Sequence, residues 1–151
     1  MKAQYRVALA GFGMMGQGYG QDQKMASYYK YTTHAQVLRD HPLMNWRLVI
    51  DVNEQACEIA KQDWQVPLAF TNIEDLGVEK DEIDILVIST PPDQRSGLIE
   101  VFPNLKAVLI EKPIASELKA SRDFAEYCAE RRLVTQVNFW RRADPTIQML
   151  A

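Results

Sequence analysis

Several features that would place this chain in a specialised class of protein are missing from its sequence. Only two of its 151 residues are cysteines, Cys57 and Cys128. Both are expected to be small buried side chains, without a redox role and without a bound metal. No apolar run approaches the roughly 20 residues that cross a bilayer. The formal net charge of −3 does not fit a nucleic-acid-binding protein with a basic face. These absences favour a cytoplasmic protein that binds neither nucleic acid nor membrane and holds no metal.

A glycine-rich segment directly follows the first apolar run. The run at 5–10 is typical of a buried strand, and the glycines after it have the pattern Gly-x-Gly-x-x-Gly. Glycines at this spacing form a tight turn and let the backbone approach a diphosphate, and the helix expected next offers unpaired N–H groups at the same place. The spacing also occurs by chance in loops, so other features must support it. The residues expected to contact a dinucleotide here are Gly11, Phe12, Gly13, Met14, Met15 and Gly16.

Strand-like and helix-like segments alternate along the rest of the chain. Further strands are expected at 48–50, 67–70, 83–88, 105–110 and 133–139, and helices at 33–41, 53–64, 93–102 and 116–132. This alternation predicts an α/β fold, namely a doubly wound parallel sheet (Rossmann fold) of about six strands with helices on both faces. No repeat, low-complexity tract or linker divides the sequence, so 1–151 is expected to be one dinucleotide-binding domain.

A carboxylate at the end of the second strand is the next feature that a dinucleotide fold requires. Asp51 stands there, and with Val52 and Asn53 it is expected to border the adenosine end of the cofactor. Because a carboxylate bonds the ribose hydroxyls and repels a 2′-phosphate, NAD is favoured over NADP. The alternative role for Asp51 is to help cap the helix that begins at Asn53.

The interval between the glycines and this carboxylate is unusually long. Asp51 follows Gly16 by 35 residues, whereas the usual gap is about 20. The excess lies at 17–32, and Thr33 to Gln36 then have the sequence of a capping box. The first helix is therefore expected to be split by an excursion and to resume near Thr33. Three roles are open for the excursion: a flap over the cofactor, a dimer contact, or a plain surface loop.

Three more segments end expected strands. They are Ile88-Ser89-Thr90-Pro91-Pro92, Glu111-Lys112-Pro113 and the run from Asn138 to Pro145. Together with the glycine turn and Asp51, they resemble the glucose–fructose oxidoreductase, inositol dehydrogenase and rhizopine catabolism (Gfo/Idh/MocA) family. The resemblance covers essentially the whole chain but only the N-terminal, NAD-binding half of the family.

The resemblance implies an NAD-dependent oxidoreductase that transfers a hydride between nicotinamide and a secondary alcohol of a sugar or polyol. In the family, the turn that matches Thr90 and Pro91 lies along the cofactor. The arginine pair that matches Arg141 and Arg142 borders the nicotinamide end and the substrate.

Lys112 is the candidate catalytic residue. In the family, the lysine at its position reaches the nicotinamide and the substrate hydroxyl, Glu111 before it belongs to the cofactor site, and the bond to Pro113 is often cis. An ammonium near the reacting oxygen stabilises developing negative charge, and a desolvated lysine can exchange the proton. The alternative is a surface lysine paired with Glu111.

The chain departs from the family pattern in several places. Arg95 stands where relatives usually have a histidine, which puts the local hydrogen bonding in doubt, and Trp140 stands where many have a smaller residue. The family's second half, with its catalytic histidine, has no counterpart, and His34 and His41 are expected to have surface or capping roles.

The end of the sequence favours a fragment of a longer protein. Asp144 and Pro145 open a helix that stops by Ala151, so truncation near 145–151 is expected, with a short natural C-terminal helix as the alternative. The chain alone should then bind cofactor without oxidising a polyol, and apolar surface left by the missing half predicts a homo-oligomer.

Two other functions remain to be distinguished. One is a standalone, non-catalytic NAD-binding module that senses nucleotide or docks to a separate catalytic subunit. The other is a domain that binds coenzyme A or a nucleotide-diphosphate sugar, against which Asp51 and the Glu111-Lys112-Pro113 segment argue.

Overall fold

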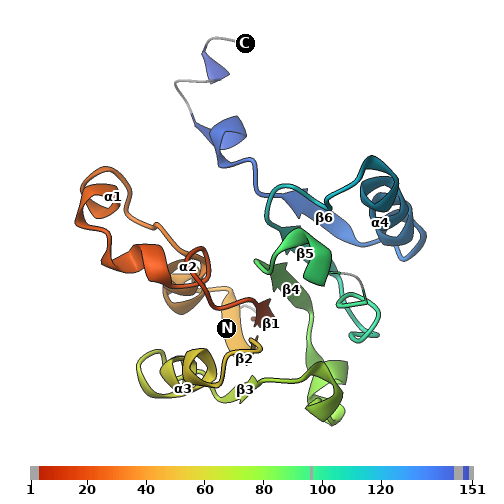
Figure 1. The fold of residues 1–151 in the computed structure, drawn as a ribbon, viewed down its shortest axis with the longest axis horizontal. Coiled ribbons are helices and arrows are strands. Elements are labelled where there is room, and N and C mark those ends of the chain that lie inside the picture. Colours follow the sequence, from red (N-terminus) through yellow and green to blue (C-terminus); the bar gives the residue numbers. More distant parts are fainter. Residues whose placement is uncertain (1–3, 96, 145–147, 150–151) are drawn as a thin grey trace.

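Six parallel strands form one sheet in the order β3-β2-β1-β4-β5-β6 (Figure 1). The structure, a computed structural model, describes residues 4–95, 97–144 and 148–149. The strands are β1 (Tyr5–Ala10), β2 (Met44–Ile50), β3 (Leu68–Phe70), β4 (Ile85–Ile88), β5 (Ala107–Ile110) and β6 (Val134–Val137). The order reverses between β1 and β4, which is the point where open α/β sheets bind ligands. The prediction of a doubly wound parallel sheet is confirmed.

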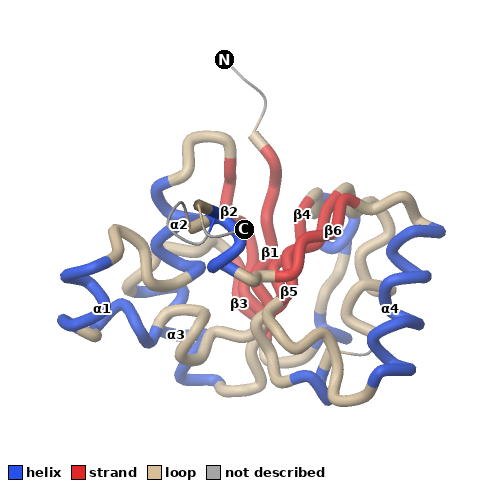
Figure 2. Tube along the Cα trace, turned by 90° about the horizontal axis from the view of Figure 1, so that it is seen from above, coloured by secondary structure: helices blue, strands red, loops and turns tan. Residues whose placement is uncertain are grey.

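Helices cover both faces of the sheet. The α-helices are α1 (Gln23–Tyr28), α2 (His34–Asp40), α3 (Glu54–Gln62) and α4 (Leu118–Glu130). Figure 2 shows α2 and α3 on one side of the strands and α4 on the other. Side chains alternate along β1, so that Val7 and Leu9 belong to one apolar cluster and Ala8 and Ala10 to the other. The central strands are therefore buried on both faces, as their apolar sequences predicted, whereas the edge strand β6 is largely exposed.

The first helix is split as the sequence predicted. After the glycines the chain makes a single helical turn, in which the Gln17 N–H donates to the Gly13 carbonyl at 2.9 Å. The excursion at 17–32 follows and contains a 3-10 turn and the short helix α1. Helix α2 then packs end-on against the first turn, because the Ala35 N–H donates to the Gly16 carbonyl at 2.9 Å. The predicted capping box between Thr33 and Gln36 begins α2.

Two expected helix positions are wrong. The segment predicted as a helix at 93–102 has only the 3-10 turn Pro92–Gln94 followed by other turns, with Ser96 outside the described residues. Gly97 has a φ of +81°, which breaks a right-handed helix, and Arg95 is held by carbonyl groups of other segments. Helix α4 begins one residue later than expected, with Glu117 rather than Ser116 at its N-cap. The helix expected after Asp144 falls largely outside the described residues.

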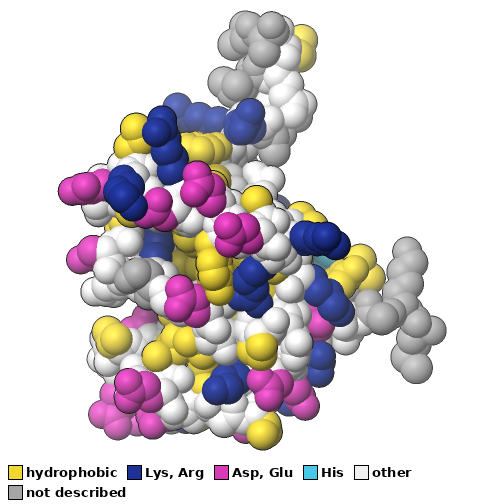
Figure 3. All heavy atoms as spheres, turned by 90° about the vertical axis from the view of Figure 1, so that its right-hand side faces the viewer, with side chains coloured by type: hydrophobic (Ala, Val, Ile, Leu, Met, Phe, Trp, Pro, Cys, Tyr) yellow, Lys and Arg dark blue, Asp and Glu magenta, His cyan; other side chains and the backbone are white. Residues whose placement is uncertain are grey.

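The two cysteines are buried and unpaired, in agreement with the sequence. Within the described parts of the chain, none of the helices is both long enough and apolar enough to cross a bilayer. On the side of the molecule that carries α4, basic and acidic side chains are interspersed, with apolar side chains between them (Figure 3).

Asp84 joins three strands at the edge opposite the glycine turn. Its carboxylate accepts the Arg6 backbone N–H at 2.8 Å and lies 2.8 Å from the Lys106 ammonium. Burial raises the pKa of Asp84, but the Lys106 and Arg6 donors outweigh burial and hold the pKa below its ordinary value. Because its folded pKa is lowered, Asp84 stabilises the fold above its unfolded pKa of about 3.9, and this contribution is lost as pH falls through the folded value.

Replacing Asp84 with asparagine is expected to lower the free energy of unfolding at pH 7 by about 1 to 2 kcal/mol, the cost of breaking a charge-assisted network. The difference from the unsubstituted protein should shrink as the pH falls below the unfolded pKa of about 3.9 and through the lowered folded pKa. Urea unfolding at several pH values measures it. Asp123→Asn, which removes an exposed pair with Lys119 on α4, is the control and should change nothing measurable. An equal effect of Asp84→Asn at every pH contradicts the interpretation.

Candidate cofactor-binding site

The glycine turn lies at the carboxyl ends of β1 and β4, where the strand order reverses. Gly11 has a φ of +89°, and a Cβ there would lie 2.7 Å from the Ser89 carbonyl carbon and from the Thr90 nitrogen. A Cβ on Gly16 would lie 2.6 Å from the Gly11 carbonyl oxygen. Only glycine fits at these two positions, because the turn packs against β4 on one side and against itself on the other.

Gly13 has a different environment, since a Cβ there would meet no protein atom within 4 Å. Nothing in the protein itself requires a glycine at this exposed position. Within the described residues, the backbone N–H groups of Gly13, Met14, Met15 and Gly16 have no acceptor. Unpaired N–H groups that open from one helical turn form a cradle for an anion. The residues present therefore fit a diphosphate.

Asp51 holds the glycine turn from the end of β2. Its Oδ2 accepts the Phe12 N–H at 2.6 Å, and its Oδ1 accepts the Asn53 N–H at 2.9 Å. Asn53 in turn caps α3 by accepting the Gln55 N–H. The contact with Asn53 is the local role that the sequence left open for Asp51. A carboxylate has about four acceptor sites, so both bonds leave capacity for ligand hydroxyl groups.

The side chains of the turn divide between core and surface. The Phe12 ring is only 1% exposed and packs against Trp46 and Trp64, so only its backbone lies at the turn. Met14 and Val52 are exposed beside the unpaired N–H groups and beside Asp51 respectively. Met14 and Val52 thus expose apolar surface next to these two segments.

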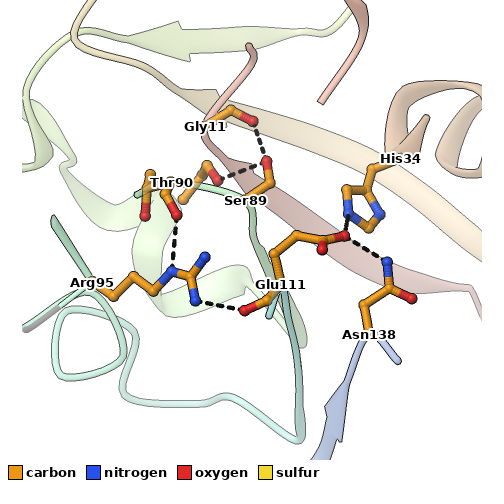
Figure 4. Close-up of polar contacts among 8 residues, drawn as sticks. Gly11, His34, Ser89, Thr90, Arg95, Glu111 and Asn138 are labelled. Carbon is orange, nitrogen blue, oxygen red and sulfur yellow. Dashed lines mark hydrogen bonds and ion pairs between the residues drawn. The ribbon is translucent and has the colours of Figure 1, made fainter. Parts of the chain in front are cut away.

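Residues at the end of β4 close the other side of the turn. The Ser89 hydroxyl donates to the Gly11 carbonyl at 2.6 Å (Figure 4). The hydroxyl oxygen of Thr90 is buried and has no hydrogen-bond partner among the described residues. A buried hydroxyl without a partner is costly, so Thr90 fits a position that a ligand's polar group completes. Pro91 follows and leads into the 3-10 turn.

Glu111, at the end of β5, is buried within a polar network. Its Oε1 lies 2.9 Å from His34 Nε2 and accepts from Asn138 Nδ2 at 2.5 Å (Figure 4). Burial raises the pKa of Glu111, but the His34 and Asn138 hydrogen bonds and the nearby charge of Lys112 outweigh burial and lower it. The expectation of a surface or capping role for His34 is wrong, since its side chain is 11% exposed and faces Glu111. His41 is exposed and caps the end of α2, as expected.

Lys112 is exposed and makes no hydrogen bond or ion pair with the described residues. The alternative ion pair with Glu111 is not formed, because Glu111 is engaged by His34 and Asn138. The bond between Lys112 and Pro113 is cis, as the resemblance implied. The Lys112 ammonium is thus available to a ligand at the carboxyl edge of the sheet.

Arg95 joins the ends of β4 and β5. Its guanidinium donates to the Thr90 carbonyl at 2.8 Å and to the Glu111 carbonyl at 2.5 Å (Figure 4). It also donates to the carbonyls of Pro113 and Ile114. Burial lowers the pKa of Arg95, and the negative charge of Glu111 offsets this only in part. Arg95 therefore forms the local hydrogen bonds that its departure from the family pattern had put in doubt.

The segment after β6 meets the excursion. The Trp140 ring contacts the Tyr29 ring edge-to-face, with centroids 5.6 Å apart, and the Arg141 guanidinium lies 5.4 Å from the centre of the Trp140 ring. Arg141 and Arg142 are both exposed. A pocket of about 390 Å³ beside them is lined by Gln136, Asn138, Phe139, Trp140, Arg142 and Gln148.

The structure brings Asp51, Thr90 and the glycine turn together, and it joins Glu111 to two residues that the sequence did not assign to the site. His34 and Asn138 were missed because their contacts span 77 and 27 residues along the chain. The available signal for His34 was its position directly after a helix cap, at the edge where ligands bind.

The fold and this site define an NAD-type dinucleotide-binding domain, and comparison with known proteins gives its family. Residues 5–139 match the Gfo/Idh/MocA family model, described as an oxidoreductase family with an NAD-binding Rossmann fold. The chain belongs to this family and is an NAD-binding domain within it.

Individual relatives are similar over parts of their length. An inositol 2-dehydrogenase from Rubrobacter xylanophilus is 39% identical over 71 residues, which are 45% of this chain and 20% of the relative. An NAD⁺-dependent scyllo-inositol 2-dehydrogenase from Bacillus subtilis is 33% identical over 69 residues, again 45% of this chain and 20% of the relative. The aligned part of the chain thus spans about a fifth of these curated relatives.

A solved structure of a scyllo-inositol dehydrogenase from Lactobacillus casei, with bound NAD(H) and scyllo-inositol, has the same fold. The TM-score is 0.74 at 22% identity, and the match covers 97% of this chain and 39% of that one.

Proposed function

We propose that this chain holds NAD for the oxidation of a secondary alcohol in a cyclic polyol, with Lys112 at the reacting oxygen. The observation that carries the proposal is the run of unpaired N–H groups from Gly13 to Gly16. Asp51 supports their turn through the Phe12 N–H, and the turn packs through Gly11 against the end of β4, where the Thr90 hydroxyl has no partner among the described residues. The inositol dehydrogenases among its relatives support a cyclic polyol as the substrate class.

Each group of site residues is assigned to one part of the cofactor. The N–H groups of the glycine turn would bind the diphosphate, and Asp51 would accept from the adenosine ribose beside Val52 and Asn53. Thr90 and Pro91 would lie along the cofactor toward its nicotinamide. Arg141 and Arg142 are assigned to the nicotinamide and substrate end.

Lys112 would act on the substrate oxygen. When bound, NAD supplies the carbon that accepts the hydride. The Lys112 ammonium would stabilise negative charge that develops on the alcohol oxygen as the hydroxyl proton leaves, and Lys112 can take part in that proton's transfer. Its exposed side chain, without a protein partner, supports this role.

Calorimetric titration with NAD, ADP-ribose and NADP tests the cofactor part of the proposal. NAD and ADP-ribose should both bind, because they share the diphosphate and the adenosine ribose. No binding of either at millimolar concentration contradicts the proposal. Binding of NAD without oxidation of any inositol is the result expected for the chain alone, and robust turnover would show that the family's second half is not needed.

Asp51→Asn is expected to reduce the preference for NAD over NADP about tenfold, because like charges in contact cost more than 1 kcal/mol. The amide retains an acceptor for one of the two backbone N–H groups, so the turn should persist. Affinities of both dinucleotides for both proteins give the ratio. The control is Asp63→Asn, at the far end of α3. An unchanged ratio would show that Asp51 only shapes the turn.

A further inference from the structure

A buried carboxylate lies directly before the candidate catalytic lysine. Glu111 is 5% exposed, yet its charge is satisfied by donors from two distant segments, His34 at the start of α2 and Asn138 at the end of β6. A buried carboxylate is costly unless hydrogen-bond donors replace the water that it loses. The contacts with His34 and Asn138 therefore fix the position of the Glu111 side chain.

The backbone around Glu111 is held as firmly as its side chain. The Glu111 N–H donates to the Ile88 carbonyl at 2.9 Å, and the Glu111 carbonyl accepts from Arg95. The Asn138 N–H likewise donates to the Ile110 carbonyl at 2.8 Å. The N–H, the carbonyl and the side chain of Glu111 are therefore all hydrogen-bonded. The Lys112 side chain, by contrast, makes no hydrogen bond or ion pair with the described residues.

His34 links this network to the rest of the cofactor site. It follows the cap residue Thr33, and its backbone N–H donates to the Met15 carbonyl of the glycine turn at 3.2 Å. Its ring nitrogen meets Glu111 on the other side. A single residue thus contacts both the turn assigned to the diphosphate and the support of Lys112.

We propose that His34 is a positioning residue, which acts through Glu111 and together with Asn138 to fix Lys112 at the nicotinamide and substrate end of the site. This inference rests on the proposed function. His34 touches neither reacting atom, and its task is to donate a hydrogen bond from Nε2 to the Glu111 carboxylate. A side chain that cannot donate there leaves the carboxylate short of a partner and lets the Glu111-Lys112 segment shift.

The experiment compares two ligands that differ only at the end in question. NADH carries the nicotinamide and ADP-ribose lacks it, so loss of Lys112 positioning should affect only NADH. His34→Ala is expected to raise the dissociation constant of NADH about threefold to tenfold, the worth of one hydrogen bond, while ADP-ribose binding stays within about twofold. His34→Gln, whose amide can donate to Glu111, should recover most of the NADH affinity. His41→Ala, at the other end of α2, is the matched control.

A second measurement follows Lys112 itself. Acetylation of lysines, read by mass spectrometry, should be slowed at Lys112 by NADH in the unsubstituted protein and less so in His34→Ala. Lys119 on α4 serves as the internal control. Asn138→Ala should reproduce the pattern of His34→Ala and keeps the test available if His34→Ala does not fold.

The outcomes separate the two proposals. If the unsubstituted protein binds neither NADH nor ADP-ribose, the proposed function fails and the inference fails with it. If both ligands bind but His34→Ala weakens them equally, or weakens neither, His34 has only a structural role and the inference alone is overturned.

Discussion

Replacing Gly13 with alanine is expected to weaken NAD binding about tenfold to a hundredfold, the worth of one hydrogen bond between a charged diphosphate and the backbone. The added methyl group would point into the space beside the unpaired N–H groups, where no protein atom lies within 4 Å. The diphosphate could then no longer approach the backbone. The thermal unfolding temperature should remain that of the unsubstituted protein, because the methyl group meets no protein atom.

Gly11→Ala is the matched comparison for this prediction. There the methyl group would lie 2.7 Å from backbone atoms of Ser89 and Thr90, at a positive φ that alanine rarely adopts. This variant should lose stability before ligand is added, whereas Gly13→Ala should lose only ligand binding. Calorimetric affinities and unfolding temperatures of both variants give the test. Unchanged NAD affinity in Gly13→Ala would show that the diphosphate binds elsewhere.

Arg95→Leu is expected to lower the free energy of unfolding by about 3 kcal/mol, because it leaves several buried carbonyl groups without a donor. The leucine can fill much of the volume, so the loss reports the hydrogen bonds rather than a cavity. Arg95→Lys should recover only part of it, since one ammonium cannot reach carbonyls on both sides as a guanidinium does. Urea unfolding of the three proteins measures the difference.

The loss of stability in Arg95→Leu should also be confined to one part of the structure. Its partners are the carbonyls of Thr90, Glu111 and Pro113, which border the cofactor site rather than the core around β1. Amide exchange should therefore increase first in the segments after β4 and β5. Exchange that increases uniformly across the sheet would instead assign Arg95 a global role.

The strands and the split helix could be predicted because their signals are local. The apolar run at 83–88 and the capping box from Thr33 to Gln36 carry their information within a few residues. The expected helix at 93–102 failed for a non-local reason. Its backbone is held by Arg95 bonds to a segment that lies 16 to 19 residues further along the chain, and Gly97 adopts a conformation that interrupts a helix.

The site shows the same division. The tight glycine turn and the place of Asp51 at the end of β2 were predictable, because each is encoded within a few residues of a strand end. Their contacts with a diphosphate and a ribose stay predictions. The partner of Glu111 was not predictable in this way. His34 and Glu111 lie on different elements and meet only after the sheet has formed and α2 has packed against the glycine turn. The capping pattern places His34 at the start of a helix, but neither it nor the periodicity identifies Glu111 as the residue that His34 meets.

The end-on contact between α2 and the glycine turn holds the two ends of the excursion at 17–32 close together. Because the Gly16 carbonyl accepts the Ala35 N–H, the helix axis is restored across the gap whatever the intervening chain does. Length and composition can therefore change there at a loop-closure cost that grows only slowly with the number of residues. Substitutions in this region, including those of Tyr29 where it meets Trp140, should therefore change the surface of the protein and leave the glycine turn and α2 in place.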